Sequence, residues 1–203
     1  MKPKYWDKAT KELSLKDPIL KKIISRHINK YLVPSNDPFN TLVNSIIGQQ
    51  ISTHAAKSIK TKLEKLTKID AKGILSKKSD ELRKCGLSNM KVNYLVNISE
   101  RVENKMTDFN HISNLEDEEA KNELMKIKGI GPWTAEMFLI FYLSRPNILP
   151  KGDVGIINSL INLYGEKNKD SINFENFFIK WSPWNSVASW FLWRNIDDTD
   201  VSY

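Results

Sequence analysis

The sequence predicts an all-α protein, and three observations carry that prediction. Apolar residues recur at the spacing of three and four that places them on one face of a helix. Residues that typically start helices precede these stretches, while the alternation between hairpin turns that marks strands is missing. No repeat of fixed period and no low-complexity linker interrupts the 203 residues. We therefore expect one compact helical unit.

The first clearly marked helix follows Asp37, because Pro38 fits the first helical position and an apolar stripe comes next. That stripe consists of Phe39, Leu42, Val43, Ile46 and Ile47. A second helix is predicted in "STHAAKSIKTKLEKL", capped by Ser52 or Thr53. The same pattern predicts further helices at residues 79–85, 90–104, 117–127, 132–143, 154–164, 174–180 and 184–195.

Composition narrows the class of protein. An apolar content of 40% is enough for a core, and a net charge of +7 favours a polyanionic partner. Cys85 is the only cysteine, which excludes an intramolecular disulfide and any zinc or iron–sulfur site built from several cysteines of this chain. We expect it to be a small buried apolar residue. No apolar stretch is long enough for a membrane span, and the N-terminal residues "MKPKYWDKAT" lack the apolar region of a signal peptide, so an intracellular protein is expected.

The stretch "KGIG" at residues 128–131 is the only connection between two predicted helices. A turn that short requires a positive φ, which glycine adopts without steric cost. Pro132 suits the first position of the second helix, whose outward-pointing amides and dipole form a site for an anion. Alone, such a turn favours a tight connection that binds nothing. The neighbouring lysines 126 and 128 favour a phosphate ligand.

Together with its flanks, "LMKIKGIGPWTAEMF" resembles the helix–hairpin–helix of the HhH-GPD DNA glycosylase superfamily. Four more segments resemble parts of that family in the same order, so that the resemblance covers roughly residues 37–195. It is closest to the 3-methyladenine DNA glycosylase II type, which excises alkylated bases. The four segments are "FNTLVNSIIGQQISTHAAKSI", "CGLSNMKVNYL", "LPKGDVGI" and "KWSPWNSVASWFLWR".

The resemblance implies a single glycosylase domain over residues 1–203, with two helical lobes on either side of an active-site cleft. One lobe is expected to span roughly 37–125, and the other to combine the N-terminal segment with roughly 126–203. The helix–hairpin–helix is expected at 117–143. Residues 1–36 are too few for the amino-terminal β-domain of larger bacterial relatives, so that domain is expected to be missing.

By resemblance the catalytic residue is Asp153, because the family places its aspartate twenty residues after the position of Trp133. A carboxylate there stabilises the positive charge that develops on the sugar, and it orients or deprotonates the attacking water. Asp153 also suits the N-cap of the helix "VGIINSLINLYG". The two roles are compatible, since capping holds the carboxylate rigidly in its charged form.

Two departures from the family pattern define the expected reaction. Glycosylases that also cut the strand carry a lysine where this chain has Trp133, and an indole forms no Schiff base. The enzyme is therefore expected to be monofunctional, using water and leaving an abasic site. The four-cysteine cluster of another branch is absent, which argues against the enzymes for oxidised pyrimidines and adenine mismatches.

A pocket for the damaged base is expected around Trp133, with Met137 one helical turn further on. Alkylated purines such as 3-methyladenine are cationic, and an indole face attracts them by stacking and by cation–π contact. Resemblance makes Trp193 the second aromatic wall, although the residue by itself fits core packing equally well. For Trp181, Trp184 and Trp190 we predict core packing.

A flipped base leaves a hole in the duplex that a side chain must fill. By resemblance this wedge is Gln50 or Ile51; a glutamine there would equally cap the preceding helix. Phosphate contacts are expected from the hairpin, with Lys57 or Lys60 adding charge. The residues predicted to contact phosphate are Gly129, Gly131, Trp133 and Thr134, with Ser88 and Lys91 on the other side.

No cofactor is expected. In the family the hairpin carbonyls also hold a structural Na⁺ or K⁺, which here implies those of Met125, Ile127 and Ile130, without a catalytic role. The implied partner is double-stranded DNA with damaged bases, and the enzyme is expected to be a monomer in the cytoplasm and nucleoid, or in the nucleus. Two alternatives stay open: a non-catalytic helix–hairpin–helix DNA-binding protein, and a glycosylase for neutral oxidised or deaminated purines.

Overall fold

Every regular element in residues 1–196, the part of the chain that the computed structural model describes, is a helix. These residues contain no strand, as predicted. The chain divides into two compact units. Unit 1 combines Met1–Pro34 with the described residues from Leu139 onward, and unit 2 is Ser35–Phe138. Helix α10 (Pro132–Phe141) runs from one unit into the other.

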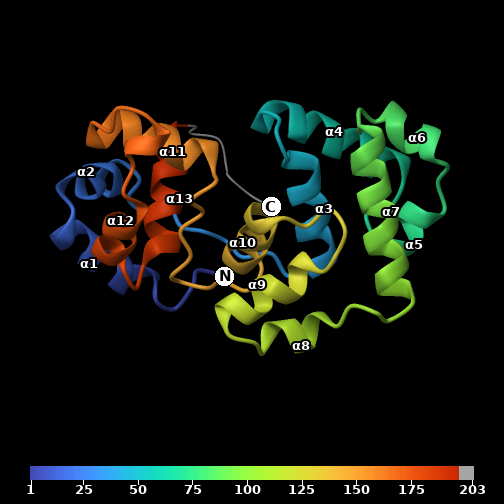
Figure 1. The fold of residues 1–203 in the computed structure, drawn as a ribbon, viewed down its shortest axis with the longest axis horizontal. Coiled ribbons are helices and arrows are strands. Elements are labelled where there is room, and N and C mark those ends of the chain that lie inside the picture. Colours follow the sequence, from blue (N-terminus) through green and yellow to red (C-terminus); the bar gives the residue numbers. More distant parts are fainter. Residues whose placement is uncertain (197–203) are drawn as a thin grey trace. The chain divides into compact units, whose positions relative to one another are not determined.

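Unit 2 contains the helices that the sequence marks most clearly. Helix α3 (Pro38–Gly48) begins after Asp37, whose side chain accepts the amide of Asn40 at 2.9 Å. Helix α4 begins after Ser52, which caps it in the same way. Figure 1 shows α7 packed beside α3, α5 and α6. The bounds of the other helices are α4 (Thr53–Leu66), α5 (Ala71–Leu75), α6 (Ser79–Lys84), α7 (Asn89–Glu103), α8 (Phe109–Ser113) and α9 (Asp117–Met125).

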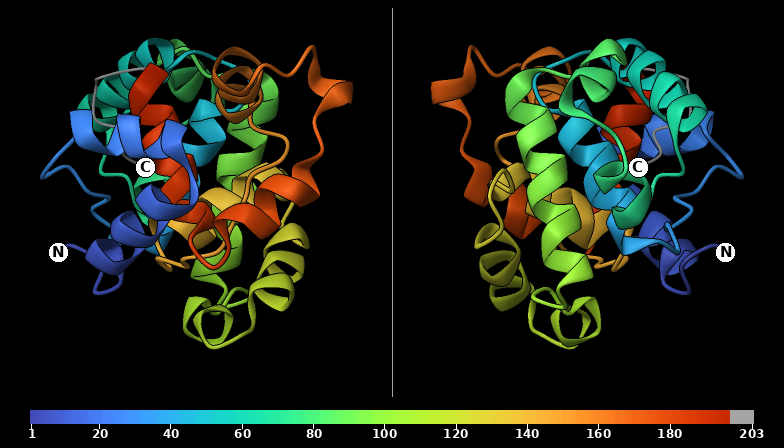
Figure 2. Two further views of the ribbon diagram at one scale, coloured as in Figure 1. Left: turned by 90° about the vertical axis from the view of Figure 1, so that its left-hand side faces the viewer. Right: turned by 90° about the vertical axis from the view of Figure 1, so that its right-hand side faces the viewer.

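Unit 1 is built around α13 (Asn185–Ile196), which is buried along nearly its whole length. Helices from both ends of the chain surround it, and Figures 1 and 2 show the first two helices beside it. Trp6 meets Trp190 edge to face, with ring centroids 5.1 Å apart. The other elements are α1 (Trp6–Lys16), α2 (Pro18–Arg26), α11 (Val154–Tyr164), the 3₁₀ helix η1 (Lys169–Ser171) and α12 (Phe174–Trp181).

Among the described residues, four α-helices were not predicted, namely α1, α2, α5 and α8, and neither was the short 3₁₀ helix η1. Helices α5 and α8 have only five residues each, too few to show a helical period. Helix α1 follows Tyr5, whose side chain does not cap it. Helix α2, in contrast, begins with Asp17 and Pro18, the same signal that identified α3.

The predicted boundary between the lobes near residue 126 is displaced: the units separate between Phe138 and Leu139. Side-chain contacts hold the hairpin and the first part of α10 within unit 2. Lys121 forms an ion pair with Glu136 at 3.0 Å, and Phe109 stacks on Phe138 with centroids 5.8 Å apart. The whole hairpin therefore lies in unit 2.

The three tryptophans and the cysteine that were predicted to pack in the core are buried. Trp181, Trp184 and Trp190 are all buried, which confirms core packing, and Cys85 is a buried free cysteine. Among residues 1–196, none of the helices combines the length and the apolar character that a membrane crossing requires.

Candidate functional site

The hairpin joins α9 to α10 through residues 126–131. Ile130 donates its amide to the Ile127 carbonyl at 3.0 Å, which tightens the turn. The first helical bond of α10 runs from the Ala135 amide to the Gly131 carbonyl at 3.0 Å, and Pro132 takes the first helical position as predicted. The first turn of α10 has no acidic residue. Its amide dipoles therefore favour an anion.

The two glycines of the hairpin differ in what they provide. Gly129 has a φ of +92°, and a Cβ there would lie 2.2 Å from Cγ of Tyr94, so its backbone rests on that ring. Gly131 has no positive φ, and a Cβ there would meet no heavy atom within 4 Å. Gly129 thus supplies the turn predicted from the sequence, and Gly131 leaves open space in front of α10.

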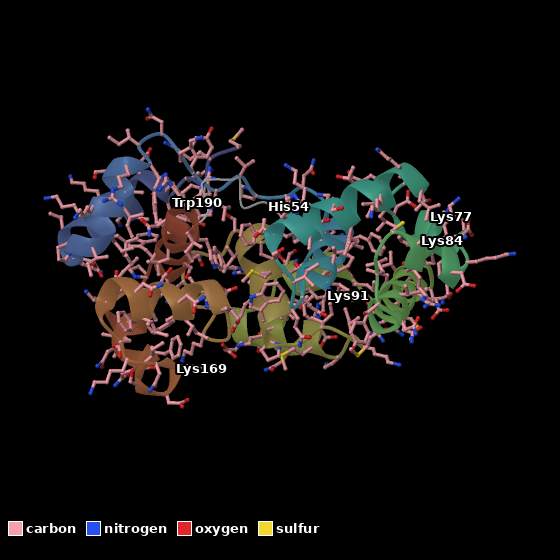
Figure 3. All side chains as sticks on the ribbon, turned by 90° about the horizontal axis from the view of Figure 1, so that it is seen from above. His54, Lys77, Lys84, Lys91, Lys169 and Trp190 are labelled. Atoms are coloured by element: carbon pink, nitrogen blue, oxygen red, sulfur yellow. The ribbon has the colours of Figure 1, made fainter. Side chains whose placement is uncertain are left out.

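Two polar side chains hold the end of α3: Gln49 bonds it to the hairpin, and Lys91 bonds it to α7. Gln49 donates from Nε2 to the Gly129 carbonyl and to Thr134 Oγ1, both at 2.9 Å. Lys91 donates from Nζ to the carbonyls of Ile47 at 2.7 Å and Gln49 at 2.8 Å (Figure 3). Burial lowers the pKa of the Lys91 ammonium. Lys91, predicted as a phosphate ligand, thus directs two of its three donors to the protein itself.

Asp153 stands at the start of α11, directly after an exposed turn. Its amide donates to the Pro150 carbonyl at 3.0 Å, which fixes the turn through Lys151 and Gly152. Its Oδ1 accepts the amide of Ile156 at 2.9 Å, so the predicted N-cap is confirmed. The helix start therefore holds this half-buried carboxylate in one orientation.

Trp193 approaches the same carboxylate from α13. Its indole Nε1 donates to Oδ1 of Asp153 at 2.8 Å, and its ring stacks on Phe141 with centroids 5.7 Å apart. Gly155 makes this approach possible, because a Cβ there would lie 3.0 Å from Asp153 Oδ1 and 3.1 Å from Trp193 Cδ1. Two donors thus converge on one oxygen of Asp153. The sequence predicted Trp193 but missed Gly155, whose only signal was its place two residues after the candidate carboxylate.

The structure thus has a glycine hairpin at the start of α10 and a capped carboxylate, Asp153, at the start of α11. The family model described as "HhH-GPD superfamily base excision DNA repair protein" matches residues 43–183. The chain belongs to this superfamily. The match includes both the hairpin and Asp153.

Known members of the HhH-GPD superfamily resemble the chain over most of its length. The 3-methyladenine DNA glycosylase Mag1 of Schizosaccharomyces pombe, solved with abasic DNA, has a TM-score of 0.82 at 26% identity, covering 95% of this chain and 99% of that one. A DNA-3-methyladenine glycosidase structure from Bacillus halodurans has a TM-score of 0.72 at 32% identity, covering 93% and 89%. The DNA-3-methyladenine glycosylase of Bacillus subtilis is 27% identical over 90% of this chain, which spans 65% of that relative's length.

The predicted wedge residues of this HhH-GPD protein follow Gln49 in the turn between α3 and α4. Gln50 has a φ of +59°, and both Gln50 and Ile51 are exposed, the latter by 38%. The glutamine that contacts the hairpin is Gln49, which the sequence reading did not select. The adjacent pair of glutamines was its only signal.

The remaining predicted residues lie as follows. Trp133 is half-buried and Met137 is fully buried in the unit 2 part of α10, whereas Asp153 and Trp193 belong to unit 1. Burial of Met137 gives no support to its predicted contact with a base. Ser88 uses its hydroxyl to cap α7, accepting the Lys91 amide at 3.2 Å.

The ligands predicted for a structural Na⁺ or K⁺ are backbone carbonyl oxygens, a type of ligand that suits these ions. The Ile127 carbonyl accepts the Ile130 amide, and a carbonyl oxygen keeps a second lone pair for a monovalent cation. Together with the carbonyls of Met125 and Ile130, it would hold the ion in a structural role only. This site stays a prediction.

Proposed function

We propose that the protein is a monofunctional DNA glycosylase that hydrolyses the N-glycosidic bond of alkylated purines in double-stranded DNA. The observation that carries this proposal is the Asp153 carboxylate, which the Ile156 amide and the Trp193 indole orient. Asp153 lies within residues 43–183, the segment that matches base excision repair proteins. The similarity to Mag1, solved with abasic DNA, supports an abasic product.

In the proposed reaction the bond between sugar C1′ and the purine nitrogen breaks, and its electron pair leaves with the base. A cationic alkylated purine departs as a neutral molecule, which makes it a good leaving group. Asp153 stabilises the positive charge left on the sugar. Water then adds its oxygen to C1′ and gives a proton to the carboxylate or to solvent. Trp133 stands where a lysine would be needed for strand cleavage, so the abasic site is the final product.

The proposed binding mode assigns DNA phosphate to the hairpin. The start of α10, the open space at Gly131 and the net charge of +7 support an anionic backbone as ligand. Exposed Ile51 and Gln50 are proposed to fill the place of the flipped base. The half-buried indole of Trp133 is proposed to stack on the cationic purine.

The test is release of free bases from methylated duplex DNA, measured by chromatography for the wild type and for Asp153→Asn. The asparagine keeps a carbonyl oxygen for both hydrogen bonds but carries no charge. We expect the wild type to release 3-methyladenine and the variant to be slower by roughly a thousandfold with unchanged DNA affinity.

Three other results would contradict the proposal. Binding of DNA without release of any modified base would indicate a non-catalytic DNA-binding protein. Release of only oxidised or deaminated purines would indicate a glycosylase for neutral lesions. A parallel loss of DNA binding and excision in Asp153→Asn would remove the assignment of Asp153 as the catalytic residue.

A further inference from the structure

The turn between α3 and α4 is bonded to the hairpin at two separate points. Gln49, which ends α3, reaches the Gly129 carbonyl in the loop and the Thr134 hydroxyl in the first turn of α10. One amide group therefore connects the turn both to the loop and to the following helix. Relative movement of turn and hairpin would break two hydrogen bonds of a half-buried side chain.

Helix α7 supports both partners of this connection. Its residue Lys91 donates to the last carbonyls of α3, where a cation also complements the helix dipole. Three residues further along α7, the ring of Tyr94 lies against Gly129 so closely that no side chain fits there. Lys91 thus fixes the turn, Tyr94 fixes the loop, and Gln49 connects the two.

The residues next to Gln49 face solvent. Gln50 takes a left-handed backbone conformation that most residues avoid, and Ile51 exposes a large apolar side chain. A rigid backbone that presents an exposed apolar residue suits a part that must enter a base stack without collapsing onto the protein.

We propose that Gln49 and Lys91 are positioning residues that lock the turn 49–51 to the hairpin, so that the group filling the vacated base position and the phosphate-binding amides meet DNA as one rigid surface. This inference rests on the proposed function. It assigns Lys91 a role different from a phosphate contact, and the two roles give opposite results in experiment.

The salt dependence of DNA binding distinguishes a phosphate contact by Lys91 from a positioning role. Each lysine that neutralises a phosphate contributes about 0.9 to the slope of log K against log salt. Lys91→Met should leave that slope and the affinity for undamaged duplex unchanged if the residue acts only on the turn. It should instead lower the single-turnover excision rate about tenfold to a hundredfold, since misplaced groups lose rate steeply.

The experiment compares Lys91→Met, Gln49→Leu, their double variant and Lys91→Arg with Lys84→Met. Lys84 is an exposed lysine of the same unit and serves as the matched control (Figure 3). The substrate is a duplex with one 7-methylguanine next to 2-aminopurine, whose fluorescence reports unstacking. We expect both single variants to lose excision and unstacking. The double variant should lose no more than the single variant with the larger loss, and Lys91→Arg should retain both excision and unstacking.

Three results would overturn the inference: a salt slope lowered by about one in Lys91→Met, full excision in both single variants, or a loss of the same size in Lys84→Met. Hydrogen exchange at residues 49–53 and 128–134 provides a readout without catalysis, and Gln49→Leu should speed it in both segments. Faster exchange in neither segment, or in the turn alone, would refute the coupling. A wild type that releases no base would refute the proposed function, and exchange would still decide the coupling.

Discussion

Asp17 and Asp153 occupy the same local position in unit 1, and each accepts an indole N–H. Asp17 caps α2 and receives the Trp181 indole at 2.9 Å, whereas Asp153 caps α11 and receives the Trp193 indole at 2.8 Å. In the sequence both look alike, as an aspartate just before an apolar helix. The local hydrogen bonds therefore do not distinguish a structural carboxylate from the one proposed to be catalytic.

The surroundings of the two carboxylates do distinguish them. Asp17 is fully buried, and its Oδ2 also accepts the Tyr164 hydroxyl at 3.0 Å and the Lys180 ammonium at 2.8 Å. Asp153 follows the exposed residues Lys151 and Gly152. An enclosed carboxylate neutralised by a lysine stabilises the fold, while one beside an exposed loop remains accessible to a reacting sugar.

The largest effect expected from this comparison is on stability. Asp17→Asn should lower the free energy of unfolding by about 2–4 kcal/mol, because it removes a buried charge that accepts several donors. Asp153→Asn should leave stability nearly unchanged. Thermal and urea unfolding of both variants check the contrast, and equal destabilisation by the two substitutions would contradict it.

The pH dependence of unfolding adds to this prediction. Burial alone would raise the pKa of Asp17, but hydrogen bonds from Lys180, Trp181 and Leu20 outweigh it and hold the pKa below its usual range. The stabilisation is therefore complete above the unfolded pKa of about 4 and is lost as the pH falls through the lower folded value. The difference between wild type and Asp17→Asn should shrink accordingly in acid.

Much of the fold could be predicted from the sequence, because its signals are local. Asp37, Ser52, Pro132 and Asp153 mark helix starts where the structure has them. Asp17 carries the same Asp-Pro signal as Asp37 and was overlooked. Nothing local reveals its burial, since the indole that it accepts lies 164 residues further along the chain.

The candidate site divides in the same way. The hairpin turn and the cap at Asp153 could be predicted from the sequence, because glycine, proline and capping residues act on the backbone next to them. The role of Gln49 could not be predicted in this way, because its partners Gly129 and Thr134 are more than 75 residues away in the sequence. The packing of α3, α7 and α10 brings them close to it. That Gln49 connects the turn to the hairpin could therefore be found only from the structure.

A smaller effect is expected at the indole that orients Asp153. Trp193→Phe keeps an aromatic ring to stack on Phe141 but removes the N–H donor. Loss of one hydrogen bond to a charged group should slow single-turnover excision about tenfold without changing the apparent affinity for substrate. Weaker binding of cationic purines at an unchanged rate would show instead that Trp193 acts as a wall of the base pocket.

The smallest effect is expected at Gly155, which allows the indole to reach the carboxylate. In Gly155→Ala the new Cβ would lie 3.0 Å from Asp153 Oδ1 and 3.1 Å from Trp193 Cδ1, so either group must move by a few tenths of an ångström. Alanine favours the helix by up to about 1 kcal/mol, which offsets the strain, so stability should change little while excision falls about threefold. Gly152→Ala is the matched control, because its Cβ would meet no heavy atom within 4 Å. If both variants excise at the wild-type rate, close contact at Gly155 is not what holds Asp153 in its active orientation.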